Sequence, residues 1–72
     1  MAARPDMTLR KVWGNIEKQK TIKGIEYPEL AVAMHISVKT LYTRRNQPAT
    51  LRGVEIVRAA NFFNMNPAEL FS

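Results

Sequence analysis

The chain contains no cysteine, and at a length of 72 residues this absence constrains the fold more than any other feature. Short domains are often stabilised by disulfides or by thiolate-bound zinc, and neither is available here. An apolar core must therefore stabilise the chain, which at this length favours one small domain of closely packed helices. The uncharged apolar stretches fall well short of the roughly 18 residues that a membrane-spanning helix needs.

The charge of the chain is distributed unevenly. Eleven Lys and Arg residues against six Asp and Glu residues give a formal net charge of +5. Residues 30–54 contain Lys39, Arg44, Arg45 and Arg52 and no acid. Because net charge reports on association with polyanions rather than on fold, this window predicts one positive face. The other bases, which we expect to be solvated, are mainly Arg10, Lys11, Lys18, Lys20 and Lys23.

The spacing of apolar residues predicts an all-α bundle of five short helices and no strand. Apolar residues recur at helical spacing in three sets: Leu9, Val12, Trp13 and Ile16; Leu30, Ala31 and Met34; and Ile56, Val57, Ala60 and Phe63. The expected ranges are Thr8–Gln19, Pro28–Met34, Val38–Asn46, Arg52 or Gly53 to Phe63, and Pro67–Phe71. Residues 8–72 would form the domain, and residues 1–7 a flexible amino-terminal arm.

Several residues carry helix-end signals. Gly24 is expected to help end the segment that follows the first helix, and Ser37 is a good N-cap for the third. Asn64 suits the left-handed position after the fourth helix. Asn66, followed by a proline and then by Glu69, has the pattern of a capping box for the last helix.

Candidate catalytic and metal-binding groups are sparse. The chain has one histidine (His35), one aspartate and five dispersed glutamates. A nucleophile needs a neighbouring base, and a metal site needs several ligands close together. We therefore expect no enzymatic activity, no cofactor and no metal, and we interpret His35 as a turn residue. Residues 1–7 lack the apolar stretch of a secretory signal, so the cytoplasm is the expected compartment.

The segment from Tyr27 to Asn46 has the layout of a helix, a short turn and a second helix. Ala31 is placed where the two helices approach most closely, and Ile36 and Leu41 fill the angle between them. Together with the end of the chain, this segment resembles the lambda-repressor-like helix-turn-helix proteins of the Cro and Xre type, most closely their small phage members. The resembling residues are Glu29-Leu30-Ala31, Ile36-Ser37, Thr40-Leu41-Tyr42, Asn46 with Pro48, and the closing run from Ala60 to Phe71.

The chain departs from the family pattern at two positions. His35 stands where the family usually has a glycine in a left-handed turn, although histidine is enriched there among the other residues. Arg44 stands where the family usually has an apolar or aromatic residue against the core, and the aliphatic stem of an arginine can pack in such a place.

The resemblance implies a sequence-specific regulator of transcription that binds double-stranded DNA, with its third helix in the major groove. By this resemblance, the protein would be a phage or prophage regulator of the repressor or Cro type. It would act in a bacterial host, bind two half-sites as a homodimer and block RNA polymerase access to a promoter. The residues implied to face base edges are Ser37, Val38, Lys39, Tyr42 and Thr43. The residues implied to contact phosphate are Tyr27, Arg44, Arg45, Asn46 and Arg52.

Alternatives stay open at this point. The same scaffold could serve as a protein-interaction module, such as an anti-repressor or an antitoxin-like partner, or as a charge-driven binder of any nucleic acid. Tyr42 could be a surface aromatic that packs on a neighbouring loop. Phe62 and Phe71 do not both fit the inward stripe, which makes them candidate contacts with a second copy of the chain; edge packing against the last helix is the alternative.

Overall fold

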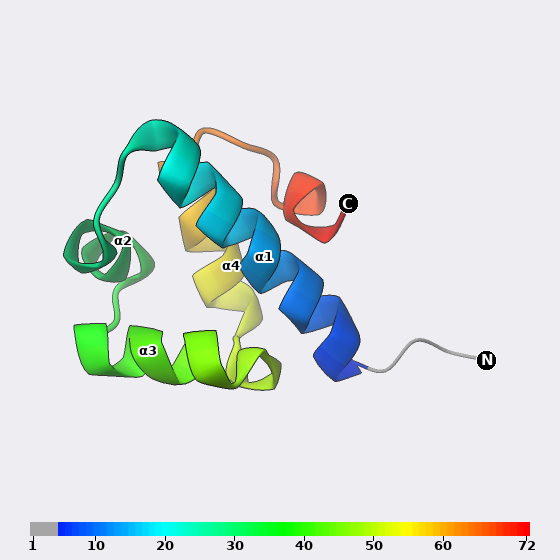
Figure 1. Cartoon of the computed structure of the whole chain (residues 1–72). Coiled ribbons are helices and arrows are strands. Elements are labelled where there is room, and N and C mark those ends of the chain that lie inside the picture. Colours follow the sequence, from blue (N-terminus) through cyan, green and yellow to red (C-terminus); the bar gives the residue numbers. More distant parts are fainter. Residues whose placement is uncertain (1–4) are drawn as a thin grey trace.

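A computed structural model describes the backbone of residues 5–72 and the side chains of residues 8–72. Every regular element in this part of the chain is helical, so the prediction of an all-α fold is confirmed. The α-helices are α1 (Pro5–Lys23), α2 (Tyr27–Met34), α3 (Val38–Asn46) and α4 (Gly53–Phe62), and two 3-10 helices, η1 (Pro48–Thr50) and η2 (Pro67–Phe71), complete the set (Figure 1). The fifth predicted helix has the expected bounds but is a 3-10 helix, and η1 was not predicted.

Helix α1 is longer than the periodicity indicated. It begins at Pro5 rather than Thr8 and ends at Lys23 rather than Gln19. Proline is well accommodated in the first turn of a helix because its missing N–H has no partner there. Residues 5–7 of the expected arm therefore belong to α1, and residues 1–4 lie outside the described part of the chain.

The core is a single cluster to which every α-helix contributes, and Figure 1 shows α1 crossing in front of α4 with α3 along the lower edge. Its members are Val12, Trp13, Ile16, Leu30, Ala31, Met34, Leu41, Leu51, Ile56, Ala59, Ala60, Phe63 and Leu70. Val57 was predicted to face inward, but it is 44% exposed, because α4 turns Ile56, Ala59 and Ala60 toward the core instead. Burial of these side chains supplies the main stabilisation of a chain without cross-links.

Three helices end in the same way, with a residue of positive φ. These residues are Gly24 (φ 66°), His35 (φ 61°) and Asn64 (φ 58°). At each end two backbone N–H groups reach back to carbonyls of the last turn; after α2, for example, Ile36 N donates to Ala31 O at 3.0 Å. This is the Schellman arrangement, which satisfies the last carbonyl groups of a helix. The predicted turn roles of His35 and Asn64 are confirmed, and Gly24 directly ends α1 because that helix continues past Gln19 to Lys23.

The predicted caps are also present. Ser37 Oγ accepts a hydrogen bond from Thr40 N at 3.0 Å at the start of α3. At η2, Asn66 Oδ1 accepts from Ala68 N at 3.0 Å and Glu69 Oε2 accepts from Asn66 N at 2.8 Å. Among the described helices, none is long and apolar enough to cross a membrane.

Candidate functional site

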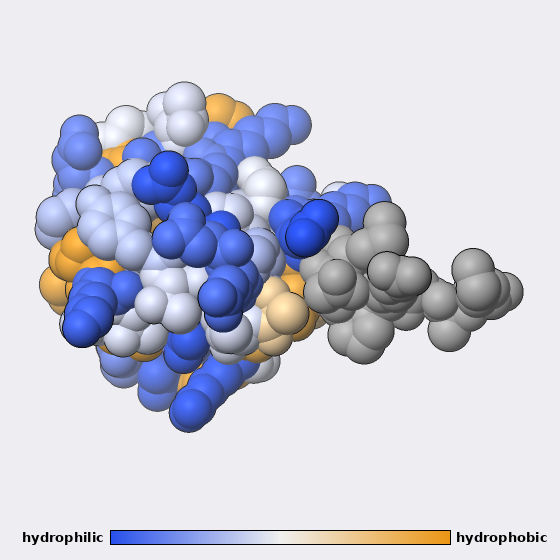
Figure 2. All heavy atoms as spheres, turned by 60° about the horizontal axis from the view of Figure 1, so that its bottom comes forward, coloured by the Kyte–Doolittle hydropathy of each residue, from blue (hydrophilic) through white to orange (hydrophobic). Residues whose placement is uncertain are grey.

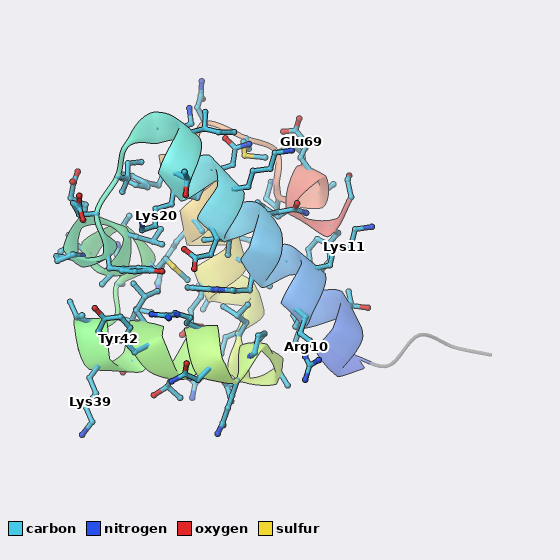
Figure 3. The ribbon with its side chains drawn as sticks, in the orientation of Figure 1. Arg10, Lys11, Lys20, Lys39, Tyr42 and Glu69 are labelled. Atoms are coloured by element: carbon cyan, nitrogen blue, oxygen red, sulfur yellow. The ribbon has the colours of Figure 1, made fainter. Side chains whose placement is uncertain are left out.

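Helix α3 presents most of its surface to solvent. All of its residues are described, and of these Leu41 alone is buried. The exposed residues are Lys39, Tyr42, Thr43, Arg45 and Asn46. Figure 3 shows Lys39 extending away from the body of the molecule, below α3. In Figure 2, where this side is turned forward, hydrophilic and weakly polar side chains dominate, with hydrophobic ones mainly toward one edge. A helix this polar is held by one apolar anchor and by contacts from its neighbours.

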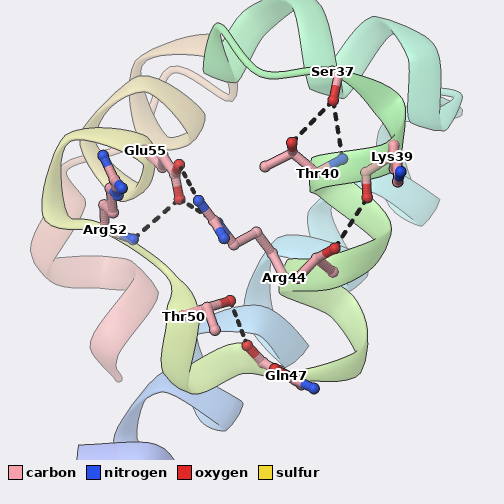
Figure 4. Close-up of polar contacts among 9 residues, drawn as sticks. Ser37, Lys39, Thr40, Arg44, Gln47, Thr50, Arg52 and Glu55 are labelled. Atoms are coloured by element: carbon pink, nitrogen blue, oxygen red, sulfur yellow. Dashed lines mark hydrogen bonds and ion pairs between the residues drawn. The ribbon is translucent and has the colours of Figure 1, made fainter.

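The predicted base-edge residues divide into two groups. Lys39, Tyr42 and Thr43 are exposed, and Thr43 Oγ1 donates to the backbone oxygen of Lys39 at 3.3 Å. Ser37 is exposed as well, but its hydroxyl is engaged in capping α3 and donates to Thr40 Oγ1 at 2.9 Å (Figure 4). Val38 is partly buried against the core, which limits what it can offer to a ligand.

Arg44 has a partner within the fold. Its Nε lies 2.9 Å from Glu55 Oε1 and its Nη2 lies 3.1 Å from Glu55 Oε2, a bidentate ion pair between α3 and α4 (Figure 4). The Arg44 side chain is 13% exposed and the Glu55 side chain 4%. One edge of the Arg44 guanidinium, formed by Nε and Nη2, therefore faces the carboxylate, which limits what Arg44 can offer to the phosphate that it was predicted to contact.

Glu55 is held in its charged form although it is buried. Burial raises the pKa of its carboxyl, but hydrogen bonds from Arg44 and from the backbone N–H of Arg52 outweigh that effect, and the pKa lies below its ordinary value. The Arg52 N–H donates to Glu55 Oε1 at 3.0 Å. Glu55 thus joins the end of α3 to the start of α4.

Tyr27 lies at the start of α2, where three helices meet. Its hydroxyl donates to the Glu17 carboxylate of α1, whose oxygens lie 2.8 and 2.9 Å away. Its ring makes an edge contact with the ring of Tyr42 on α3, with centroids 5.6 Å apart. Partial burial and the neighbouring Glu17 carboxylate raise the pKa of Tyr27. The hydroxyl predicted to contact phosphate is therefore engaged with a carboxylate, and Tyr42 packs on Tyr27 while remaining 42% exposed.

Two cations border this aromatic pair. Lys20 Nζ lies 4.3 Å from the centroid of the Tyr27 ring. Arg45 Cζ lies 5.8 Å from the Tyr27 centroid and 6.0 Å from the Tyr42 centroid. These distances are within the range of cation–π attraction. Lys20, which was expected among the solvated bases, therefore lies over the Tyr27 ring at the start of α2.

The remaining predicted phosphate contacts are accessible. Arg45, Asn46 and Arg52 are all exposed, on α3 and just before α4. The candidate site is consequently the exposed face of α3 together with Arg52. Sequence reasoning missed Glu17, Lys20 and Glu55, and only Glu55 carried a local signal, since a glutamate three residues after the start of a helix is typical of a capping box.

The two phenylalanines proposed as contacts with a second copy are both accessible. Phe62 is 40% exposed and Phe71 46% exposed. Phe62 lies beside a shallow hollow between α2 and α4 that His35 and Arg58 also line. Its ring is 5.5 Å from that of Phe63, so one side packs on the core and the other faces solvent.

The described residues contain no group of three or more His, Cys, Asp or Glu side chains that could hold a metal ion. No protein-family model, curated protein or solved structure matches the chain. The functional assignment therefore depends on the surface chemistry of α3 and its surroundings.

Proposed function

We propose that this chain is a sequence-specific DNA-binding regulator of the phage repressor or Cro type, with α2 and α3 acting as a helix-turn-helix. One observation carries the proposal: α3 is attached to the core through Leu41 and presents exposed lysine, tyrosine, threonine, arginine and asparagine side chains. Its sequence, and the 25-residue window around it, contain no acid that would repel a polyanion.

In this proposal the exposed residues have separate tasks. Lys39 donates to guanine acceptors, and Thr43 donates to a base edge or offers its methyl group to thymine. Tyr42 contacts the bases with the exposed part of its ring. Arg45, Asn46 and Arg52 bind phosphates, which fix the register of the protein without reading sequence.

Two contacts hold α3 in a defined orientation for this task. The Arg44–Glu55 ion pair ties its carboxyl-terminal half to α4, and the Tyr27–Tyr42 edge contact ties its middle to α2. Base readout depends on side chains that are placed by a rigid scaffold, because a small misplacement removes a directional hydrogen bond. A helix held only by Leu41 would lack this support.

In this proposal the protein regulates transcription by occupying its operator. A homodimer binds two half-sites about one turn of DNA apart and blocks access to the promoter. Phe62 and Phe71 are the candidate contacts between the two copies, and their exposed rings suit a small apolar interface that forms when both copies are bound to adjacent half-sites.

The test is selection of duplexes from a random pool at moderate salt, followed by titration of the enriched sequence. We expect one enriched motif with two-fold symmetry, bound at least about 10³-fold more tightly than random duplex. Equal binding to all duplexes would contradict the proposal and favour the alternative of charge-driven nucleic-acid binding. A failure to bind any duplex would leave the protein-interaction module as the better hypothesis.

A further inference from the structure

Glu17 is an acid that the proposed function does not use, and its contacts are specific. It lies on α1, where Lys20 follows within one helical turn. The structure nevertheless gives its carboxylate no ion pair, since Arg44–Glu55 is the one ion pair among the described residues. The Tyr27 hydroxyl donates to it instead, with the two carboxylate oxygens 2.8 and 2.9 Å away. Glu17 thus links α1 to the first residue of α2.

The Tyr27 ring is held on several sides. Its hydroxyl end is fixed by Glu17, and the ring packs, partly buried, against the core. The Lys20 ammonium lies over its face, 4.3 Å from the centroid. A tyrosine ring has only two side-chain torsions, so contacts at its hydroxyl end and at its face together leave it little freedom. The ring is therefore a fixed surface for a side chain that packs on it.

Tyr42 packs on this surface from α3. The two ring centroids are 5.6 Å apart and the ring planes are inclined at 64°, which is an edge contact. Because Tyr42 is 42% exposed, the contact covers one side of its ring and leaves the other side open to a ligand. A long side chain in a helix has two accessible χ1 positions, and an edge contact between aromatic rings favours one of them. The position of the Tyr27 ring therefore bears on the direction in which the exposed part of Tyr42 points.

We propose that Glu17 is a positioning residue for base recognition, because it fixes the Tyr27 ring, and that ring selects the conformation in which Tyr42 meets a base pair. Glu17 itself contacts no base and acts through side chains on two further helices. This role rests on the proposed function, and it adds α1 to the elements that determine sequence preference. A change in α1 should then alter which base is preferred at one position of the half-site, not only how tightly DNA is bound.

Two substitutions of Glu17 separate the hydrogen bond from the charge. Glu17→Gln keeps an oxygen that can accept from the Tyr27 hydroxyl, and Glu17→Ala does not. Both remove one negative charge, so any general gain in affinity for DNA is common to them. Selection from a random pool with Tyr42→Ala identifies the half-site position at which Tyr42 acts. At that position we expect Glu17→Ala to lower the ratio of preferred to next-best base about three- to fivefold, which is within the strength of one hydrogen bond, and Glu17→Gln to lower it less than about twofold.

Tyr27→Phe and a neighbouring variant of α1 complete the design. Tyr27→Phe keeps the ring but removes the donor, so it should reproduce the change in base preference caused by Glu17→Ala. The double variant should show no larger change than either single variant, because both remove the same hydrogen bond. Lys18→Ala changes the exposed residue next to Glu17 and should leave every base preference as in wild type.

A measurement without DNA checks the positioning step directly. In NMR spectra of the free protein, nuclear Overhauser effects between the rings of Tyr27 and Tyr42 should be present in wild type and in Glu17→Gln. They should weaken in Glu17→Ala, and the χ1 angle of Tyr42, measured from three-bond couplings, should change from one conformer to a mixture. Circular dichroism at the same temperature establishes that each variant is folded; if Glu17→Ala does not fold, Tyr27→Phe provides the same comparison.

The outcomes distinguish this role from the proposed function. If wild type selects a motif but Glu17→Ala changes only affinity or melting temperature, with base preferences unaltered, the positioning role is wrong and the proposed function stands. The role is also wrong if Glu17→Gln and Glu17→Ala change the preference equally, if Tyr42→Ala changes no base preference, or if the Tyr42 conformation is the same in all variants. If wild type selects no duplex, both proposals fail.

Discussion

The guanidinium of Arg44 and the carboxylate of Glu55 form a nearly buried bidentate pair, with N···O distances of 2.9 and 3.1 Å. The two positions are eleven residues apart in the sequence. The pair crosses from α3 to α4, and it neutralises an arginine that would otherwise belong to the positive face of α3. Removing one member of such a pair is costly because the other charge is left buried without a partner.

Glu55→Gln should therefore lower the free energy of unfolding by about 2–3 kcal/mol, somewhat less than for a fully buried pair because the Arg44 side chain keeps slight access to water. The amide retains an oxygen for the Arg52 N–H but cannot pair with the Arg44 charge. Urea unfolding followed by circular dichroism measures the effect. Glu69→Gln is the matched control, since Glu69 occupies the corresponding place in the capping box of η2, is exposed, and should lose less than about 0.5 kcal/mol.

The free energy of unfolding at acidic pH should also depend on the Arg44–Glu55 pair. Because the folded-state pKa of Glu55 is lowered, its contribution is complete above the unfolded value near 4.5 and is lost as pH falls through the folded value. The difference in unfolding free energy between wild type and Glu55→Gln should be constant from pH 6 to pH 8, to within about 0.3 kcal/mol, and should shrink below about pH 4.5. A difference that does not change down to pH 3 would contradict the charged state assigned to Glu55.

Tyr27→Phe removes the hydroxyl that donates to Glu17 and keeps the ring that Lys20 and Arg45 approach. We expect a loss of about 1 kcal/mol in unfolding free energy, because the bond is to a charged acceptor but is only partly shielded from water. Since the pKa of Tyr27 is raised, its contribution is complete below the unfolded value of 10.0 and is lost as pH rises through the folded value. The stability gap between wild type and Tyr27→Phe should therefore narrow above pH 10 in denaturant titrations.

Lys39→Ala should change which duplexes are selected from a random pool. Lys39 extends away from the body of the protein and has no partner among the described residues that competes for its ammonium. Loss of a direct base contact should relax the preference at one position of each half-site by about 1–3 kcal/mol. Sequencing of the selected pools measures this. Identical preferences for wild type and Lys39→Ala would remove Lys39 from base readout.

Arg45→Ala should weaken binding to all duplexes together. A phosphate contact carries no sequence information, so the ranking of selected sequences should stay the same while the salt slope becomes smaller by about 0.9. Lys11→Ala serves as the control for loss of one positive charge on another face. If Arg45→Ala reorders the selected sequences instead, Arg45 contacts bases rather than phosphate.

Much of the fold follows from local sequence patterns. The bounds of α3, its Ser37 cap and the left-handed ends at His35 and Asn64 were predicted correctly, because each depends on interactions within one helical turn. The error at Val57 has a physical reason. Val57 was assigned to the core although it is exposed, since a helical stripe specifies which residues share a face but not how far that face rotates toward its neighbours.

The sequence predicted the composition of the candidate site but not the contacts that its side chains make. The sequence by itself determined that α3 is polar, basic and free of acids, and that its exposed residues are of the kinds that contact bases and phosphates. Only the tertiary structure decided that Arg44 is paired with Glu55, that the Tyr27 hydroxyl is engaged with Glu17, and that Lys20 lies over the Tyr27 ring. The partners in these contacts come from different helices. Charge counted along a chain is therefore a poor measure of charge on a surface, because electrostatic interaction depends on distance in space and on burial, neither of which a short sequence window contains.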